Sequence, residues 1–558
     1  MFIRVKTTPN STKKYVQIVQ SIRKGDKVSQ KIVRHVGYAL DDEELVQLRN
    51  LAESIKLKLE ADNQEFLISP EELAKIKNRN KDFRKYKQEQ EAELFKVNLK
   101  DLIEEDRIVS GIHDIYGSLF DEIGFKYTFP NPARNKMVVN IFKDIVLARV
   151  ANPKSKLATV DMLEEDFGIS IPLEKVYRMM DKLDDKAIGR LQDLTYKYTN
   201  GLYREKIDVL FYDCTTLYFE SFTEDSFKRM GYSKDLKFNQ SQVLLALLVT
   251  KEGLPIGYRA FEGNKYEGHT LLPVLEEIRE KYTIDRVVIV ADSAMLNRAN
   301  IKDLEVHGFN YIVGARLKSM SKAQKAEILE SSKYRKVSEG FSIGEFEYRE
   351  GLRLIVSYKK DRAKKDRIDR ERAVAKLMKK LSTSQSHKEY LSNYGYKKYL
   401  KVIGESKIEL DTEKLKSAGE WDGLHGVITN CTDLSPEEVL RQYSQLWLVE
   451  ESFRITKHDL KVRPIFHWKP HRVKAHLAIS YVAFSLARYM EYRIRLQYKK
   501  LSPERIRQHL IRVQTSVLFD RKRKIRYAFP SKISQEAYKF YKIFKMERKL
   551  TPVLVEKM

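Results

Sequence analysis

Residues 207–314 alternate between short apolar segments and amphipathic helical segments, and this pattern constrains the fold more than any other part of the sequence. Three apolar segments come first, IDVLFYD, QVLLALLVT and LPIGYRAF, and the tripeptide KEG between the last two predicts a hairpin. The amphipathic helix HTLLPVLEEIREKY then leads to the apolar strand DRVVIVAD, and the helix NRANIKDLEVHG leads to the strand NYIVGAR. The predicted order is βββαβαβ, which is typical of an α/β fold built on an open sheet.

An acidic residue ends two of these predicted strands, Asp213 the first and Asp292 the fourth. Because ligands of open α/β sheets bind at the carboxyl ends of the strands, both positions are candidates for a site. Aspartate is also common in turns that follow strands, so either residue alone has a simpler explanation. Two of them on strands that we expect to be neighbours indicate one shared site, in the layout of a ribonuclease-H-like core.

The segment YSQLWLVEESFRITK, residues 443–457, predicts a helix that presents a third acid. Helical periodicity places aromatic, basic and acidic side chains on one face, namely Tyr443, Trp447, Glu450, Arg454 and Lys457. An apolar stripe predicts the face that docks on the core, namely Val439, Leu446, Val449, Phe453 and Leu460. The start of the helix is predicted by Ser435 as N-cap, Pro436 in the first turn and Glu438 closing a capping box.

Three carboxylates held together have a specific chemical use. Close carboxylates repel each other and raise a pKa unless a divalent cation lies between them. Hard oxygen ligands suit Mg²⁺ or Mn²⁺, and two such ions can activate the attacking oxygen and stabilise the leaving one in phosphoryl transfer. For each acid alone a solvated or capping role is the simpler interpretation. Together, Asp213, Asp292 and Glu450 predict a catalytic metal site, because the strand order, the strand ends and the polar helix face agree.

The sequence carries 104 Lys and Arg residues against 78 Asp and Glu residues, a formal net charge of +26. A basic excess of this size favours a polyanionic partner, most commonly nucleic acid, and general solubility is the alternative. The two cysteines, Cys214 and Cys431, have no metal-binding spacing, which argues against a zinc finger or a disulfide framework. No signal sequence or apolar run long enough for a membrane span occurs, so we expect a cytoplasmic, nucleoid-associated protein with no membrane partner.

The regions that flank the α/β region differ from it in hydrophobic pattern and charge. Residues 14–36 alternate around Gly25 and predict a β-hairpin, and a polar helical stretch rich in Lys and Glu follows. Residues 137–184 predict three helices, with Ser155 as N-cap of the second, Gly168 at its end and Pro172 opening the third. These helices either read DNA as a helix-turn-helix or only pack together. Residues 315–420 predict a β-rich insertion with a basic helix, which holds 11 Lys or Arg and 4 Asp or Glu over residues 359–380.

The predicted fold class is therefore α/β. A ribonuclease-H-like catalytic core is interrupted by a β-rich insertion, preceded by an N-terminal β-hairpin and helical region, and followed by C-terminal helices. The predicted boundaries are 1–136 for the N-terminal region, 137–200 for a helical region, 201–314 for the first part of the core, 315–420 for the insertion, 421–500 for the second part of the core with the Glu450 helix, and 501–558 for a basic C-terminal helical region.

Three segments, FYDCTTLYFES (211–221), VIVADSAML (288–296) and YSQLWLVEESFRITK (443–457), resemble the DDE transposases of bacterial insertion sequences. The resemblance is to the branch marked by a Tyr-Arg-Glu-Lys signature with the spacing Y-x2-R-x3-E-x6-K. Tyr443, Glu450 and Lys457 fall on that spacing, whereas Leu446 stands at the arginine position. The segments RPIFHWKPHRVKAH (463–476) and ANPKSKLATVDML (151–163) also resemble the family, so the resemblance spans nearly the whole chain.

This resemblance implies an enzyme that binds the inverted terminal ends of its own element in double-stranded DNA. It would cut there with Mg²⁺ and join the freed 3′-OH ends to target DNA, as a homodimer that holds two ends together. The resemblance makes Asp213, Asp292 and Glu450 the metal ligands and gives Tyr443 and Lys457 phosphate contacts, which a phenol and an ammonium permit. Leu446 cannot bind phosphate in the bidentate manner that the arginine of the signature allows. Arg454 either takes over this role or is a solvated helix residue.

Further candidate DNA contacts lie around the Glu450 helix. All three tryptophans, Trp421, Trp447 and Trp468, fall within this part of the chain. Relatives stack an unpaired base on an aromatic near the site, and Trp447 is the first candidate and Trp421 the second. Burial of both in the core is the alternative. Arg472 and His476 share a helix face and either reach DNA or contribute to packing.

Two other functions fit part of the sequence. A metal-dependent ribonuclease-H-like nuclease would use the same acids, because water and a 3′-OH enter the same site. A non-catalytic DNA-binding regulator derived from a transposase would not need all three acids, and their presence counts against it.

Overall fold

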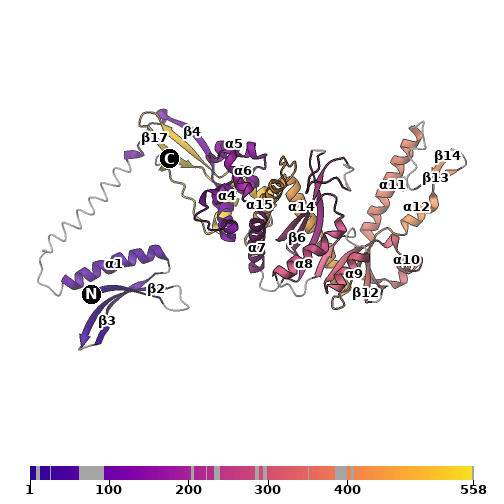
Figure 1. The fold of residues 1–558 in the computed structure, drawn as a ribbon, viewed down its shortest axis with the longest axis horizontal. Helices are drawn as coiled ribbons and strands as arrows, with labels where there is room; N and C mark the ends of the chain where they lie inside the picture. The colour runs from indigo at the N-terminus through magenta and orange to yellow at the C-terminus, as the bar shows by residue number, and fades with distance from the viewer. Residues whose placement is uncertain are drawn as a thin grey trace. The chain divides into compact units, whose positions relative to one another are not determined.

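The computed structural model describes residues 1–7, 13–24, 27–39, 41–61, 93–202, 207–220, 223–231, 239–282, 288–292, 298–349, 351–383, 399–403 and 407–555. The chain forms two compact units, Met1–Leu102 and Ile103–Met558 (Figure 1). Across the described residues, no helix combines the length and apolar character that crossing a membrane requires.

The first unit contains the predicted hairpin. Strands β1 (Phe2–Thr7), β2 (Lys14–Lys24) and β3 (Lys27–Ala39) pair antiparallel in that order, and helix α1 (Asp42–Ala61) packs on them. Gly25, predicted in the turn between β2 and β3, lies outside the described residues. The alternating apolar residues of β2 form the small core with α1, namely Val16, Ile18 and Ala52.

The second unit is built on a nine-stranded mixed sheet with the order β10-β11-β12-β15-β9-β8-β5-β6-β7. The strands that the 207–314 pattern predicted are β5 (Val209–Tyr218), β6 (Gln242–Thr250), β7 (Pro255–Glu262), β8 (Val288–Ala291) and β9 (Asn310–Ala315). The two predicted helices are α8 (Leu271–Tyr282) and α9 (Arg298–Val306), so the order βββαβαβ is confirmed. Strands β5, β8 and β9 run parallel, whereas the β6–β7 hairpin pairs antiparallel to β5.

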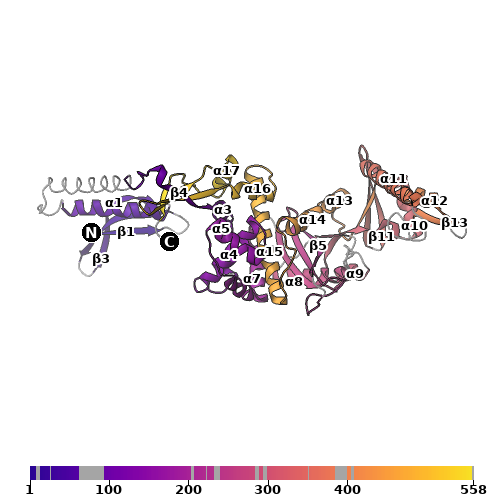
Figure 2. The same ribbon diagram turned by 90° about the horizontal axis from the view of Figure 1, so that it is seen from above.

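The two faces of this sheet are both buried, which explains the nearly continuous apolar strands. On β5, Val209 and Phe211 join the core that contains the C-terminal helices, whereas Leu210 and Tyr212 join the opposite core with α8 and α9. Helices α13 (Pro436–Ser444) and α14 (Trp447–Arg454) accordingly lie on one side of the sheet and α8 and α9 on the other (Figure 2).

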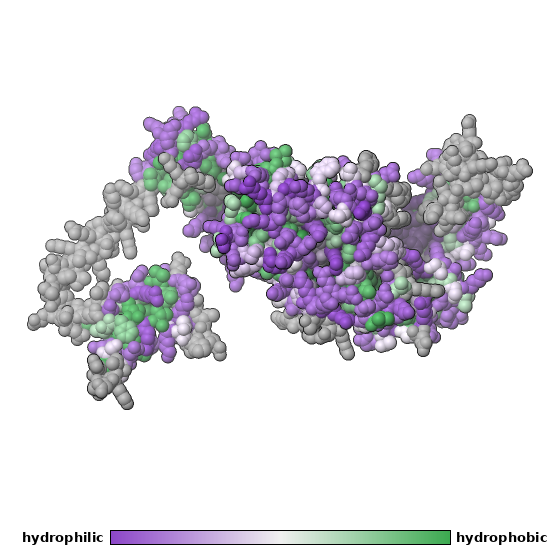
Figure 3. All heavy atoms as spheres, viewed as in Figure 1, coloured by the Kyte–Doolittle hydropathy of each residue, from purple (hydrophilic) through white to green (hydrophobic). Residues whose placement is uncertain are grey.

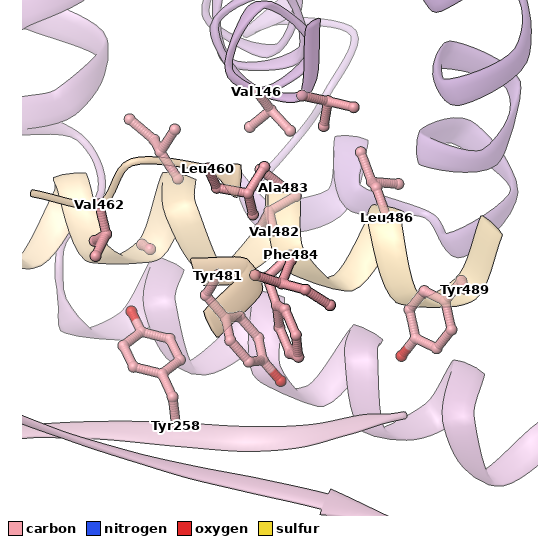
Figure 4. Packing of buried hydrophobic residues seen from close by; sticks show 14 of the residues in the cluster. Val146, Tyr258, Leu460, Val462, Tyr481, Val482, Ala483, Phe484, Leu486 and Tyr489 are labelled. Carbon is pink, nitrogen blue, oxygen red and sulfur yellow. The ribbon is translucent and has the colours of Figure 1, made fainter. Parts of the chain in front are cut away.

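A helical region packs on the α14 side of the sheet. It comprises α3 (Gly111–Ile123), α4 (Lys136–Ala151), α5 (Lys156–Phe167), α6 (Leu173–Asp181), α7 (Asp185–Leu202) and α15 (Pro470–Gln497). The three helices predicted over 137–184 are α4 to α6, with Ser155 capping α5 as predicted. Helix α15 is largely buried: Val146 of α4 lies on one side of it and Tyr258 of β7 on the other (Figure 4).

The insertion extends the sheet. Strands β10 (Arg335–Ser338), β11 (Phe341–Arg349) and β12 (Leu352–Lys359) continue the core sheet through β15 (Leu424–Thr429), which pairs with β9. The predicted basic helix is α11 (Lys360–Thr383), and further elements of the insertion are α10 (Lys322–Leu329), β13 (Leu400–Ile403), β14 (Lys407–Leu410) and α12 (Thr412–Gly419).

The C-terminal region is only partly helical, and the prediction of helices throughout is wrong there. Helices α16 (Pro503–Ile511) and α17 (Gln535–Ile543) flank a hairpin of β16 (Gln514–Asp520) and β17 (Ile525–Pro530). The hairpin joins β18 (Val553–Val555) and β4 (Leu102–Val109) in a four-stranded sheet. The basic run RKRKIR therefore forms the hairpin turn and the start of β17, where the Asp520 carboxylate accepts the backbone N–H groups of Lys522 and Arg523.

The face of the molecule shown in Figure 3 is predominantly hydrophilic over the described residues, with hydrophobic residues in small patches.

Candidate active site

The two strand acids follow the last paired residues of adjacent parallel strands. Tyr212 of β5 pairs with Ala291 of β8, so Asp213 and Asp292 are the next residues along the two strands. The prediction that β5 ends at Asp213 is wrong, because this strand continues to Tyr218 and pairs with β6 beyond the acid. What ends at Asp213 is the pairing with β8, and this opens the edge at which the acids lie.

Both acids belong to the sheet face that α14 covers. Side chains alternate between faces along a strand, so Asp213 shares a face with Phe211, and Asp292 shares a face with Val290. Phe211 and Val290 belong to the same hydrophobic core as Val449, which anchors α14. The backbone N–H of Cys214 donates to Oδ1 of Asp213 at 2.7 Å.

The helix that carries Glu450 is interrupted, which the 3.6-residue periodicity did not predict. Helix α13 ends at Ser444, and α14 begins at Trp447 after a turn at Gln445 and Leu446. Across this turn the backbone hydrogen bonds tighten to a three-residue spacing, for example from Leu446 N–H to the carbonyl of Tyr443 at 3.0 Å. A π-helical segment, Ile455–Asp459, follows α14. Tyr443, Glu450 and Lys457 therefore lie on three different helical segments.

The start of α13 agrees with the prediction in part. The side chain of Ser435 accepts the N–H of Glu438 at 3.2 Å, and Pro436 occupies the first turn. The Glu438 carboxylate, predicted to close a capping box, instead accepts hydrogen bonds from Arg441 and Gln442.

The interruption leaves Tyr443, Leu446 and Glu450, but not Lys457, on one cavity. An open cavity of about 480 Å³ is lined by Asp292, Tyr443, Leu446, Trp447 and Glu450, among other residues. Leu446 is buried in the core that docks α14, as predicted, whereas Trp447 is 47% exposed. The structure thus brings two of the three predicted metal ligands to one cavity, and the sheet register brings the third, Asp213, beside Asp292.

Buried Arg488 fixes the position of α14. Its guanidinium donates to Glu491 of α15 at 2.6 Å, to Glu451 of α14 at 3.4 Å and to the carbonyl of Gly253 at 2.9 Å. Gly253 has φ +75, and a Cβ there would come within 2.0 Å of the Arg488 guanidinium, so this turn requires glycine. The helix bearing Glu450 is therefore tied to α15 and to the β6–β7 turn.

The electrostatics of the cavity also connect these residues. Burial, and then the carboxylates of Asp292 and Glu450, raise the pKa of Tyr443 above its usual value, so its phenol stays protonated. Burial, and then the cations Arg362 and Lys359, lower the pKa of His425 to about 4, against an opposing effect of Asp292. The site therefore combines carboxylates, a phenol donor, a neutral imidazole and exposed cations.

The three carboxylates occupy one region without a metal-ligating arrangement. Among the residues that the structure describes, no three His, Cys, Asp or Glu side chains lie close enough together to hold a metal ion. The donor chemistry of Asp213, Asp292 and Glu450 nevertheless fits a hard divalent cation, because all three supply carboxylate oxygens.

The remaining predicted DNA contacts lie in different surroundings. Arg454 pairs with Asp459 and Glu451, and Arg472 donates two hydrogen bonds to Asp181 and lies over the ring of Tyr177. Trp421 is partly buried against the core on the far side of the sheet. Lys457 is partly buried on the π-helical segment. His476 is buried and bonded to the carbonyl of Val462, so it contributes to packing.

Several cavity residues were not singled out from the sequence. Lys359, Arg362, His425 and Arg441 line the cavity together with the acids. The basic helix over 359–380 was predicted, but no local pattern indicated that its first turn faces the acids. That placement depends on β12 and β15 joining the core sheet.

Similar solved structures include transposases. A cryo-EM structure of the piggyBac transposase synaptic complex with hairpin DNA is similar at 12% identity and a TM-score of 0.39, over 72% of this chain and 76% of that chain. The Mos1 transposase paired-end complex with left transposon end is similar at 14% identity and a TM-score of 0.14, over 29% of this chain and 54% of that chain. TM-scores this low do not establish a shared fold. No curated protein sequence matches the chain.

Family models identify the chain more directly. The N-terminal domain of the IS1634 family transposases matches residues 3–65, a range that includes strands β2 and β3, most of β1, and α1. The transposase DDE domain matches residues 204–486, which is half of the 558 residues and includes all three acids. The chain therefore belongs to the DDE transposases of bacterial insertion sequences, enzymes that cut DNA and transfer its strands.

Proposed function

We propose that Asp213, Asp292 and Glu450 are the catalytic carboxylates of this transposase, and that the core that carries them is ribonuclease-H-like. The observation that carries the proposal is the pairing of Tyr212 with Ala291, which places both aspartates side by side on the sheet face covered by α14. Glu450 of α14 shares a cavity with Asp292.

The same three residues would hold Mg²⁺ or Mn²⁺. Carboxylates are the ligands these ions prefer. Asp213 is on strand β5, Asp292 directly follows strand β8, and Glu450 is on a helix anchored by Arg488. When bound, such ions supply activation of the attacking oxygen and stabilisation of the leaving oxygen in phosphoryl transfer.

Residues around the acids would bind and orient the DNA end. The Tyr443 hydroxyl stays protonated and is able to donate to a phosphate oxygen. Lys359, Arg362 and Arg441 line the cavity and would balance phosphate charge. Trp447, exposed beside Glu450, offers a ring on which an unpaired base would stack.

Other predicted contacts belong to the same proposal. Lys457, Arg454, Arg472 and Trp421 would contact DNA outside the cavity, where Arg454 and Arg472 would exchange their carboxylate partners for phosphates. The substrates would be the terminal inverted repeats of the element and the target DNA, both double-stranded, held by a homodimer. A nuclease that only hydrolyses DNA is not favoured, since both family matches are to transposases.

A strand-transfer assay tests the proposal. The purified chain is incubated with labelled terminal repeats and a supercoiled plasmid in Mg²⁺. The wild type should give cut ends and joined product, and Asp292→Ala should give neither while still binding the repeats. Glu413→Gln, at an exposed acid of α12, is the matched control and should behave as wild type. Full activity of Asp292→Ala would show that the assigned site is wrong.

A further inference from the structure

A second cavity lies outside the one that contains the acids. It has a volume of about 620 Å³ and is formed by the first turn of α5, by Arg149 of α4 and by the segment from Lys461 to His467. We call it the α5 cavity. Its walls come from ANPKSKLATVDML and RPIFHWKPHRVKAH, two segments that have no role in the proposed catalytic centre.

The α5 cavity is basic and contains no counter-charge. Five of its lining residues are cations, namely Arg149, Lys154, Lys156, Lys461 and Arg463. No acidic residue is among the described residues that line it. Pro153, Tyr177 and Phe466 contribute apolar surface, with Phe466 63% exposed at the rim.

Two of these cations are buried side by side. Lys156 is 5% exposed and Arg149 is 4% exposed. Arg149 donates to the carbonyls of Leu460 and Lys461 at 2.9 and 3.2 Å. Among the described residues, no hydrogen bond or ion pair to the Lys156 ammonium is found, and burial followed by the charge of Arg149 lowers its pKa well below the usual value. A buried cation that lacks an anionic partner is unfavourable, so this arrangement indicates a site for an anion.

The backbone of the cavity favours the same kind of ligand. Ser155 caps α5, a helix of 12 residues, and accepts the N–H of Ala158 at 3.2 Å. Lys156, Leu157 and Ala158 of the first helical turn line the cavity, where the helix dipole adds positive potential. Lys156 is the first residue of this helix, so its ammonium and the helix terminus act together.

The α5 cavity is connected to the elements that carry the acids. Its segment Lys461–His467 follows α14 and the π-helical turn directly in sequence. The guanidinium of Arg463 lies 5.4 Å from the ring centre of Tyr218, the last residue of the strand that carries Asp213. The α5 cavity is therefore linked to β5 through Arg463 and to α14 through the segment that follows it.

From this geometry we propose that the α5 cavity binds a backbone phosphate of DNA, with Lys156 and Arg149 as the buried cations and the α5 N-terminus as the hydrogen-bond donor. The ligand class is a phosphodiester, read for its charge and not for its base sequence. The proposal rests on the chain acting on DNA, as a transposase does, but not on which residues hold the metal.

Salt-dependent DNA binding tests this site. Full-length wild type and Lys156→Met are titrated with a fluorescent duplex of random sequence in EDTA, so that no cleavage occurs and the metal site plays no part. Lys156→Met should weaken binding by about 10-fold or more. It should also reduce the slope of log K against log salt concentration by about 0.9, the value for one lost phosphate contact.

The chain offers a matched control. Lys322 is also the first residue of a helix, α10, after a capping serine, Ser321, but it is exposed. Lys322→Met should leave both the affinity and the salt slope as in wild type. Should Lys156→Met fail to fold, Lys156→Gln, which keeps a donor, replaces it in the same titrations.

Two outcomes would overturn the proposal. One is a Lys156 variant that binds DNA with the affinity and the salt dependence of wild type, measured with a wild-type preparation that is active in transposition. The other distinguishes a free anion from DNA: at constant ionic strength, inorganic phosphate raises the melting temperature of wild type but not of Lys156→Met, while both bind the duplex equally. Failure of the Asp292→Ala test would leave these titrations unaffected.

Discussion

Asp213 and Asp292 lie next to each other at the point where β5 stops pairing with β8, because Tyr212 and Ala291 form the last pair of that parallel ladder. β5 then continues beside β6, so the acid projects from the middle of a strand that is buried on both sides. A carboxylate in such a position has little freedom to relax. The same register places both acids on the face where α14 brings Glu450.

Replacing Glu450 by Gln should remove a metal ligand while keeping the shape of the side chain. Because substitutions even of residues behind metal ligands cost about 10–100-fold in activity, we expect Glu450→Gln to lower strand cleavage by at least about 100-fold. DNA affinity in EDTA should stay at the wild-type value. Cleavage kinetics and binding titrations measure the two effects, and loss of both would indicate misfolding instead of a lost ligand.

Trp447→Ala should weaken binding of a DNA end that has an unpaired base. Stacking on an aromatic side chain contributes about 1–3 kcal/mol, so the dissociation constant should rise by about 5–150-fold. The melting temperature should not change, since Trp447 is 47% exposed. Trp468→Ala is the matched control: this ring is 70% exposed, lies over Lys228 and is not among the residues lining the cavity with the acids. Equal losses in both variants would argue against a specific stacking role.

Leu446→Arg introduces an arginine where the resemblance drawn from the sequence expects one, at a position that is 7% exposed. The variant loses apolar burial and places a charge in the core that docks α14, so we expect the free energy of unfolding to fall by about 2–5 kcal/mol. Denaturant unfolding measures it. Leu446→Met, which conserves volume, should cost less than about 1.5 kcal/mol. A stable arginine variant that binds DNA ends more tightly would contradict this expectation.

Acid should destabilise the protein through buried histidines. Burial, and then Arg149 and Lys156, lower the pKa of His476 well below its usual value, and burial with Lys156 and Arg149 lowers that of His467 to about 3. Below pH about 6.5 the unfolded state therefore binds more protons than the folded state, and the free energy of unfolding falls as the pH falls. Each group contributes up to about 1.4 kcal/mol per pH unit.

His476→Gln keeps a donor for the carbonyl of Val462 and removes one of these groups. The slope of the free energy of unfolding against pH between about pH 6 and 4.5 reports how many more protons the unfolded state binds than the folded state. In this variant that slope should decrease by the amount expected for one proton. Denaturant unfolding in MES and acetate buffers measures the slope. An unchanged slope in His476→Gln would refute the assignment.

The local pattern of the sequence determined the elements and several of their ends. Alternation and apolar runs predicted β5 to β9, and Ser155, Pro172, Gly168 and Ser435 marked helix ends that the structure contains. The acids on the first and fourth strands, and the glutamate on a polar helix face, were visible as a candidate site. Each of these features depends on residues within one or two turns of helix or one strand, so it can be read from a short window.

Only the tertiary structure decided how distant segments combine. The turn at Gln445 and Leu446 follows no helix-breaking residue, and Leu446 packs into the core at this turn. β16 and β17 join β4 across roughly 400 residues of sequence, and the insertion strands join β9 through β15. From the sequence, Lys156 is expected to be a solvent-exposed lysine in the first turn of a helix, but it is buried beside Arg149. Strand pairing, burial and the proximity of charges depend on which distant segments pack together. Local periodicity does not specify those segments.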